Sequence, residues 1–307
     1  MPEMSLSEGF LKIIKTANRF HEADSCKRLC KPFLVEGKQV GWIHPDILRH
    51  LKHFPDIFSF VSCLVTGEIK HVAMNFDLNT YESRSEKMAN VIQELRKKDS
   101  LVALKGWRDE EFEVWHKLSE PPLLKLERSA TSLFGVRQYG VHVNGYVFHS
   151  TKGLSMWIGK RSKTKPTWPG KLDQMAAGGI PSGMSVLECC KNECREEASI
   201  PEKYLEKLKP VGTVSYFYED ERGLFPETQY VYDLELPEDF EPVNADGEME
   251  NFELIPIEKV KELIVGDDFK FNCSVVVLDF LIRHSLISPE DEPNYTQLVQ
   301  GIHTPLS

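Results

Sequence analysis

The sequence lacks the features that mark several large classes of protein. It has no uninterrupted apolar run of about 18 residues, the length that crosses a bilayer, so no membrane span is expected. Basic residues are in deficit, with 37 Lys and Arg against 47 Asp and Glu and a net charge of −10. A surface that displaces counterions from a nucleic acid is therefore not expected. A small phosphorylated ligand is compatible with this charge, because a bound divalent metal can supply positive charge locally.

Cysteine and histidine show none of the spacings that are typical of common metal centres. Seven cysteines are scattered along the 307 residues, and this odd number favours free thiols in a reducing compartment. Cys190 and Cys194 could be half of a zinc site, but no second pair follows at the usual spacing, so buried thiols are the preferred interpretation. The N-terminal stretch has no secretory signal pattern. A cytoplasmic location is expected, with organellar targeting left open.

The chain divides into two units and a tail. Residues 1–122 are expected to form a small α/β domain, in which "PFLVEGKQVGWI" predicts two strands around a turn and "DEEFEVWHKL" predicts a helix. The pair Pro121-Pro122 marks the boundary. Residues 123–290 are dominated by strands, and Asn144-Gly145 between apolar runs predicts a hairpin turn. Residues 291–307 are expected to be a loosely held tail, and the fold class is α+β with a mixed sheet.

An acidic helix is predicted in the stretch "GGIPSGMSVLECCKNECREEASIP". Ser185 and Glu188 form the S-x-x-E pattern of a capping box, and Pro201 prevents the helix from continuing. Helical spacing places an apolar stripe on one face, made of Leu187, Cys190, Cys194 and Ala198. It places three carboxylates on an adjacent face, those of Glu193, Glu196 and Glu197.

These clustered carboxylates have two interpretations. Like charges at this spacing destabilise a helix by only a few tenths of a kcal/mol per pair, so an ordinary solvated face is possible. Carboxylates are also the hard oxygen ligands that Mg²⁺ takes when it is shared with a substrate phosphate. A glycine-bearing loop enters the helix at Gly178 and Gly179, and such a loop lets the backbone approach a phosphate.

The loop, helix and glutamates together resemble the Nudix box, G-x5-E-x7-R-E-U-x-E-E-x-G-U, where U is a bulky aliphatic residue. Gly178 fills its first position, and Glu193, Glu196 and Glu197 fill the three helix glutamates that hold the metal in Nudix enzymes. Cys194 and Ile200 take the two bulky positions. The sequence departs from the pattern at three positions, which are Met184 for glutamate, Asn192 for arginine and Ser199 for glycine.

Surrounding segments such as "FGVRQYGVHVNGYV", "TWPGKLDQMAAGGIPSG" and "YVYDLELPEDFEP" resemble the Nudix branch related to thiamine pyrophosphokinase. This resemblance implies a Nudix α/β/α sandwich preceded by a smaller N-terminal domain. It also implies metal-dependent hydrolysis, with Mg²⁺ or Mn²⁺, of thiamine diphosphate and preferably its damaged oxy and oxo forms. The products would be the monophosphate and phosphate. The implied partner is this small diphosphate, with no nucleic acid, no membrane and a possible homodimer.

Further site residues are expected around the box. Glu248 or Glu250 could add a ligand or base from outside it, as another glutamate does in many Nudix enzymes, and the alternative is a solvent-facing acidic turn. Arg161 and Lys160 could bind the diphosphate, and the alternative is a solvated strand end. The side chains of Trp157 and Trp168 could stack on a heterocycle, although aromatic residues on strands more often belong to a core.

Two other functions are consistent with these residues. One is a Nudix hydrolase that acts on another nucleoside or sugar diphosphate, such as ADP-ribose. The other is a catalytically silent Nudix module that only binds a phosphorylated ligand, which the residues at Met184 and Asn192 would permit. The sequence does not assign a role to the N-terminal domain, which could complete the substrate pocket, form dimer contacts or stabilise the fold.

Overall fold

The computed structural model describes residues 5–165 and 167–306, and within them it has two main sheets. The N-terminal sheet has the order β2 (Lys38–Ile43), β1 (Lys31–Val35), β4 (Ile69–Met74), β3 (Phe58–Ser62). The second sheet has the order β11 (Lys209–Asp220), β12 (Gly223–Glu235), β7 (Gln138–His149), β8 (Gly153–Arg161), β13 (Met249–Pro256). Strand β10 (Ala176–Gly179) pairs with β7, and β9 (Leu172–Asp173) pairs with β8. Because β12 runs parallel to β7 while the other pairs are antiparallel, the predicted mixed sheet is confirmed.

The N-terminal elements follow their local sequence signals. Glu36 and Gly37 join β1 to β2, both with positive φ (51° and 74°), which is the turn that suits the twist of a hairpin. The predicted strand pair is therefore confirmed. Helix α2 begins at Pro45, whose missing N–H costs little in a first turn. The helical elements of this part are η1 (Arg19–His21), η2 (Cys26–Arg28), α2 (Pro45–Leu51), α3 (Tyr81–Lys97), α4 (Val102–Lys105) and η3 (Arg128–Ala130).

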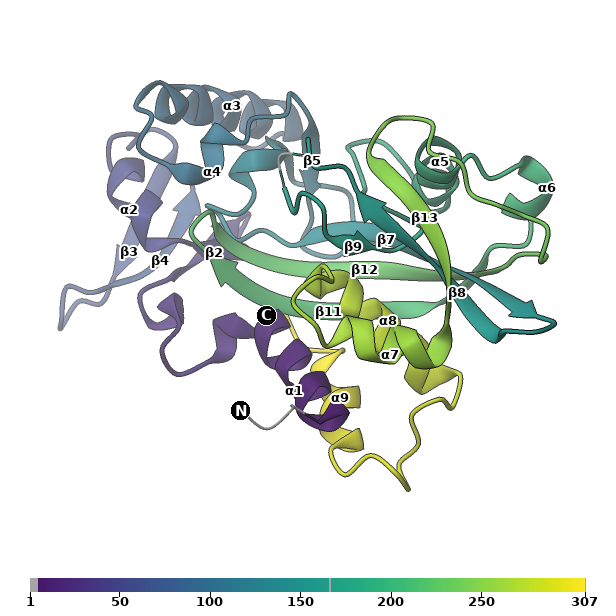
Figure 1. Cartoon of the computed structure of the whole chain (residues 1–307). Helices are drawn as coiled ribbons and strands as arrows, with labels where there is room; N and C mark the ends of the chain where they lie inside the picture. Colours follow the sequence, from purple (N-terminus) through teal and green to yellow (C-terminus); the bar gives the residue numbers. More distant parts are fainter. Residues whose placement is uncertain (1–4, 166, 307) are drawn as a thin grey trace.

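The predicted helix over "DEEFEVWHKL" is wrong, because its central residues form a strand. Strand β5 (Glu111–Val114) pairs antiparallel with β6 (Leu124–Glu127). Phe112 and Val114 are buried, while Glu111 is exposed, so the segment alternates with the period of two that a strand requires. Figure 1 places β5 between the N-terminal helices and the helix α5 (Val186–Ala198).

The predicted hairpin turn at Asn144-Gly145 is also wrong, because β7 runs straight through these residues. The Asn144 side chain is buried, donates to Asp233 Oδ1 at 3.0 Å and accepts from Gln174 Nε2 at 2.7 Å. A Cβ on Gly145 would overlap the sulfur of Met175, so glycine here makes room for a core side chain. The chain turns later, between His149 and Gly153.

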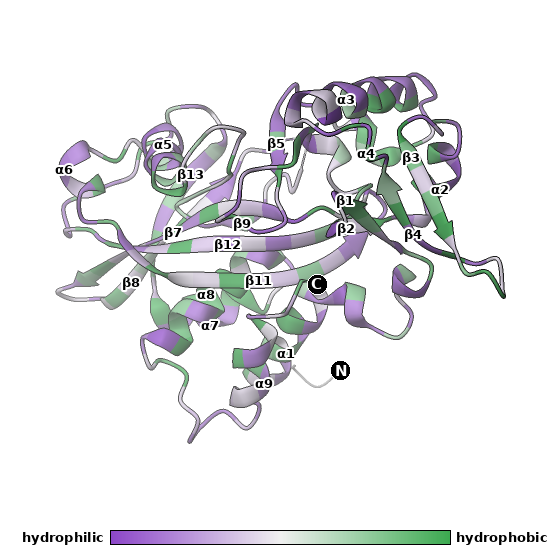
Figure 2. Cartoon of the chain, turned by 180° about the vertical axis from the view of Figure 1, so that it is seen from behind, coloured by the Kyte–Doolittle hydropathy of each residue, from purple (hydrophilic) through white to green (hydrophobic). Residues whose placement is uncertain are grey.

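Helices cover both faces of the large sheet, which gives the expected three layers (Figure 1). One face carries α5 and α6 (Glu202–Leu205). The opposite face carries α7 (Ile257–Ile264), α8 (Phe271–Arg283), α1 (Leu6–Ala17) and α9 (Tyr295–Gly301). Figure 2 shows the long strands β11 and β12 running from this sandwich to the N-terminal sheet. Among the described residues, no helix combines the length and apolar character needed to cross a membrane.

The hydrophobic cores of the N-terminal sheet and of the helices around α8 do not separate at the predicted boundary positions. Leu124 and Leu126 of β6 belong to the core of the N-terminal sheet, and Phe10 and Ile13 of α1 belong to the core under α8. The N-terminal core therefore extends past residue 123, and the first helix packs with the C-terminal part. The limits 1–122, 123–290 and 291–307 remain predictions about independently folding units.

The C-terminal segment is packed, in contrast to the expected loose tail. Helix α9 buries Leu298 completely, and the Asn18 side chain donates to the Gly301 carbonyl at 2.9 Å. Gly301 lies so close to Ile14 that a Cβ would overlap that side chain. The sequence signal was weak because only a few apolar residues of this segment face the core.

We predict that Leu298→Ala lowers the free energy of unfolding by about 2–5 kcal/mol, the usual cost of a large-to-small change in a core. Urea denaturation of the full chain measures this change. Val243→Ala, at a side chain that is 60% exposed, is the control and should change stability by less than about 0.5 kcal/mol. Equal effects of the two substitutions would show that α9 is not part of the core.

Candidate active site

Helix α5 begins and ends as its sequence predicts. The hydroxyl of Ser185 accepts a hydrogen bond from the Glu188 N–H at 3.3 Å, which caps the first turn. Ser199 closes the helix in the left-handed conformation, with φ 51°, a position where the Nudix pattern has glycine. Of the predicted stripe, Cys190, Cys194 and Ala198 are buried. Leu187 is exposed, and Cys189 takes the buried place instead, because the core faces a slightly rotated side of the helix.

The three box glutamates differ in exposure along this helix. Glu197 is buried and accepts a hydrogen bond from the Ala177 N–H of β10 at 2.8 Å. Glu193 is half-buried, and Glu196 is exposed. Burial, and then the charges of Glu196 and Glu248, raise the pKa of Glu193 to about 7. Burial, and then the Glu193 charge, raise the pKa of Glu197 well above its ordinary value.

Glu248 lies in the loop before β13 and is electrostatically linked to this cluster. Its charge contributes to the raised pKa of both Glu193 and Glu197. Burial favours its neutral form, but Lys165, with Nζ 2.5 Å from a Glu248 oxygen, outweighs burial and lowers the pKa of Glu248. Glu250, the other candidate, is exposed and pairs with Lys160 at 3.5 Å. The structure therefore brings Glu248 toward the box glutamates.

The glycine pair of β10 is explained by close contacts on each residue. A Cβ on Gly178 would overlap the carboxylate of Glu193. A Cβ on Gly179 would lie 2.6 Å from the ring of Phe112, so glycine is needed for β5 to approach this strand. Both glycines also line the cavity described below. Side chains at either position would displace a box glutamate or the N-terminal part.

Two departures from the box pattern contact each other. The side-chain amide of Asn192 lies 3.8 Å from the sulfur of Met184, so the loop and the helix still meet at these positions. Arg195 lies one turn further on, and its guanidinium donates to Asn192 Oδ1 at 2.9 Å and to Glu202. The loop-to-helix contact is thus kept by uncharged side chains.

Arg161 and Lys160 do not line the cavity. Arg161 is buried, pairs with Asp173 at 2.7 Å and donates to the carbonyls of Thr167 and Trp168, each at 3.1 Å. It therefore fixes the loop that carries Trp168. Lys160 is partly exposed and pairs with Glu250. Their direct binding of substrate remains a prediction, and the contacts of Arg161 assign it a positioning role.

The two tryptophans have different surroundings. Trp168 lines the cavity in the left-handed conformation, with φ 53°, and its ring meets Phe271 edge-on at 5.6 Å. Trp157 is buried in the core under α5, and its indole N–H has no hydrogen-bond partner among the described residues. The Trp168 ring can therefore stack on a ligand in the cavity. Trp157 is instead a core residue, which was the alternative given for it in the sequence analysis.

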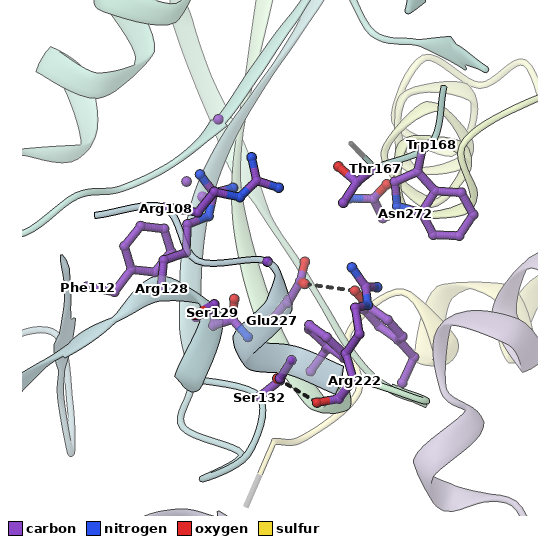
Figure 3. Close-up of a pocket in the computed structure, with 18 of the residues that line it drawn as sticks. Arg108, Phe112, Arg128, Ser129, Ser132, Thr167, Trp168, Arg222, Glu227 and Asn272 are labelled. Atoms are coloured by element: carbon purple, nitrogen blue, oxygen red, sulfur yellow. Dashed lines mark hydrogen bonds between the residues drawn. The ribbon is translucent and has the colours of Figure 1, made fainter. Parts of the chain in front are cut away.

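A cavity of about 300 Å³ lies beside β10, a size within the range of small-molecule sites. Figure 3 shows Arg108, Phe112 and Arg128 on one side, Thr167, Trp168 and Asn272 on the opposite side, and Glu227 between them. The predicted Trp168, Gly178 and Gly179 are in its lining. The sequence analysis missed the N-terminal residues because their segment carries no motif, and missed Glu227 because one acidic residue on a strand is not distinctive.

The inner wall of the cavity carries hydrogen-bonding groups between aromatic rings. The carboxyl of Glu227 accepts from Tyr216 and from Gln229 Nε2, each at 2.7 Å, and burial raises its pKa. Gln229 Oε1 is buried and has no hydrogen-bond partner within the described residues. The rings of Tyr218 and Phe225 stack at 4.6 Å beside these groups. This wall can hold a flat ring and bind polar atoms on its edge.

Comparison with known proteins gives two adjoining family matches. Residues 9–138 match a domain of unknown function (DUF4743), and residues 138–273 match the NUDIX domain. Nudix hydrolase 24, chloroplastic, of Arabidopsis thaliana is 39% identical and covers 96% of this chain and 77% of its own length. Nudix hydrolase 20, chloroplastic, of the same plant is 42% identical with the same coverage. A crystal structure from Deinococcus radiodurans is 19% identical, with a TM-score of 0.42, and covers 55% of this chain and 97% of that chain.

The chain belongs to the Nudix hydrolase family, whose members act on pyrophosphate bonds. The prediction of a Nudix enzyme of α+β fold, made from an imperfect box, is confirmed. The comparisons give no test of the thiamine pyrophosphokinase-related branch, which remains a prediction.

A divalent metal fits the chemistry of the acidic cluster. Among residues 5–165 and 167–306, no group of three or more His, Cys, Asp or Glu side chains is arranged so that it could hold a metal ion. The charge of Glu196 nevertheless raises the pKa of Glu193, the charge of Glu193 raises that of Glu197, and a hard cation would relieve this repulsion. Assignment of Glu193, Glu196 and Glu197 as ligands remains a prediction.

We predict that the metal-free protein loses stability as the pH rises from about 4.5 to about 7, because of Glu193. The pKa of Glu193 is higher in the folded state (about 7) than its ordinary 4.5, so the folded state binds more protons in this range. The loss is on the order of 3 kcal/mol. Glu193→Gln should reduce this slope in urea denaturation with EDTA and leave the part that comes from the raised pKa of Glu197, and Glu188→Gln, at the exposed cap, should leave the slope unchanged. A slope as steep in Glu193→Gln as in the unsubstituted chain would contradict the assigned pKa.

Proposed function

We propose that this Nudix hydrolase is a divalent-metal-dependent diphosphatase of thiamine diphosphate and, preferably, its damaged oxy and oxo forms. The products are the monophosphate and phosphate. The observation that carries the substrate assignment is the inner wall of the cavity, where the carboxyl of Glu227 lies beside the stacked rings of Tyr218 and Phe225. A pyrimidine edge, with its ring nitrogens and one exocyclic substituent, matches such a wall.

The carboxyl of Glu227 can suit a substituted pyrimidine. Burial raises its pKa, which favours the protonated form, and in that form one oxygen donates a hydrogen bond while the other accepts one. An oxo pyrimidine has both a ring N–H and a carbonyl oxygen, which can pair with the accepting and the donating oxygen of this one carboxyl. This complementarity supports a preference for the oxy form.

The reactive end of the substrate would lie against Gly178 and Gly179, beside the acidic helix. Glu193, Glu196 and Glu197 would hold Mg²⁺ or Mn²⁺, which when bound polarises the phosphoryl group and lowers the pKa of water. Glu248 is ionised because Lys165 lowers its pKa, so it can accept a proton from the attacking water. The water oxygen bonds to the terminal phosphorus, and the bond from that phosphorus to the bridging oxygen breaks. The monophosphate leaves with the bridging oxygen.

Several finer assignments belong to the same proposal. Catalysis by Glu248, a cytoplasmic location and a possible homodimer are expectations from the sequence. The word chloroplastic describes the two plant relatives.

We predict that the purified chain with Mg²⁺ releases phosphate fastest from oxythiamine diphosphate, and then from thiamine diphosphate. A panel that adds ADP-ribose and nucleoside diphosphates separates the rival functions, with phosphate and nucleotide products measured together. Faster cleavage of ADP-ribose would overturn the thiamine assignment. No turnover of any substrate, with binding retained, would favour the silent module.

We predict that Glu197→Gln and Glu196→Gln each lower kcat by at least about a hundredfold, a typical scale for the loss of one catalytic group. Steady-state rates on the best substrate of the panel measure this loss. Glu188→Gln, on the same helix but at its exposed cap, should keep the rate within about twofold. Unchanged rates in both glutamate variants would refute the metal-ligand assignment.

A further inference from the structure

We infer that the N-terminal domain, which matches a domain of unknown function, is a part of the active site that binds the diphosphate of the substrate. Arg108 supplies the unpaired cation among the described lining residues, and Arg128, which is paired with Glu110, is the second arginine on the same side of the cavity. This inference rests on the pyrophosphate-bond chemistry of the family and not on thiamine as the substrate.

The N-terminal domain forms one side of the cavity. Arg108, Phe112, Arg128 and Ser129 line it together with Gly178 and Gly179 of the Nudix domain. Figure 3 shows Arg108, Arg128 and Phe112 entering the cavity from the same side. Phe112 lies directly on Gly179, and the Ser182 N–H donates to the Glu111 carbonyl at 2.9 Å. The two domains are thus joined by direct contacts at the wall where the substrate's phosphates are expected.

The cations that the Nudix domain contributes to the cavity are already paired. Arg222 pairs with Asp220, and Lys270 pairs with Asp173 at 3.2 Å. Arg128 pairs with Glu110 at 2.8 Å, and its guanidinium lies 5.2 Å from the Phe112 ring centre. Arg108 forms no ion pair or side-chain hydrogen bond with any described residue, so its full charge is available to a ligand.

The backbone around Arg108 is fixed before any ligand binds. The Arg108 N–H donates to a carboxylate oxygen of the buried Glu127 at 2.9 Å. The next residue, Asp109, is in the left-handed conformation with φ 57°, and its carboxylate accepts from the Trp107 indole at 2.7 Å. Across the hairpin, the Arg128 N–H donates to the Glu110 carbonyl at 2.7 Å. A fixed backbone lowers the ordering cost of binding.

The chemistry of these groups selects a phosphate ligand. A guanidinium presents parallel N–H donors that match two oxygens of one phosphate, and it stays charged at every physiological pH. A diphosphate placed beside the box glutamates is repelled by them, so it needs cations in the same part of the cavity. Arg108 and Arg128 lie across the cavity from Trp168 and Asn272 (Figure 3), and the charge of Arg128 also acts on Glu193, whose pKa it lowers. The N-terminal domain therefore supplies positive charge for the diphosphate, which the described cavity-lining residues of the Nudix domain do not offer in unpaired form.

The test uses the full chain with Arg108→Ala, Arg108→Lys and Arg128→Ala, and with Arg49→Ala as the matched control. Arg49 is an exposed arginine of the same domain on α2, away from the cavity. On the best substrate of the panel, Arg108→Ala should raise KM at least about tenfold and change kcat by less than about threefold. Arg108→Lys should recover part of this loss, since it restores the charge but not the paired donors. Arg128→Ala should weaken substrate binding in the same direction.

Calorimetric binding of inorganic pyrophosphate separates this inference from the substrate assignment. Arg108→Ala should weaken that binding at least about tenfold, with the thermal unfolding midpoint unchanged, even if no thiamine compound is hydrolysed. KM and pyrophosphate affinity equal to those of Arg49→Ala would overturn the inference. A fall in kcat that accompanies a lower unfolding midpoint, with pyrophosphate affinity unchanged, would also overturn it, because the arginine would then be structural.

Discussion

The close approach of two side chains to the backbone of β10 is the constraint on which the site depends. Glu193 lies on Gly178 from the side of α5, and Phe112 lies on Gly179 from the side of β5. Adjacent residues of a strand point to opposite faces, so one short strand receives a contact from each face. The distance of the acidic helix from β10 is therefore limited by Gly178, and the distance of β5 from β10 is limited by Gly179. This makes the glycine pair a joint between the two domains as well as a wall of the cavity.

A buried carboxylate organises the opposite wall. Asp173 of β9 pairs with Arg161 and Lys270 and accepts from the thiol of Cys273 at 2.7 Å. Burial opposes its charge, but Lys270 and Arg161 outweigh burial and hold the pKa of Asp173 well below its ordinary value. The network joins β8, β9 and α8 and carries the loop with Trp168. The glycine pair and the Asp173 network thus position two walls of the cavity.

The sequence predicted those parts whose signals are local. The capped helix α5 and the strand pair around Glu36 and Gly37 follow from patterns a few residues long. Asn144-Gly145 misled because the same residues suit a turn and a buried strand, and only the contacts with Asp233 and Met175 distinguish them. Three of the six predicted substrate-binding residues line the cavity, which are Trp168, Gly178 and Gly179. They could be predicted because they belong to segments that resemble those of a known family. Arg108 and Glu227 come together from positions more than a hundred residues apart, which no local pattern reports.

The packing of α1 has a consequence for the order in which the chain can fold. The Ser7 hydroxyl donates to Glu292 at 2.6 Å, a contact between residues 285 positions apart. Helix α1 shares its core with α8 and α9, which are synthesised more than 250 residues after it. During synthesis the apolar face of α1 therefore stays uncovered until α8 and α9 have been made. The N-terminal sheet can form earlier, because its contacts join residues that are nearer in sequence. Long-range closure of this kind is slow and exposes apolar surface, so the nascent chain is a natural client for chaperones.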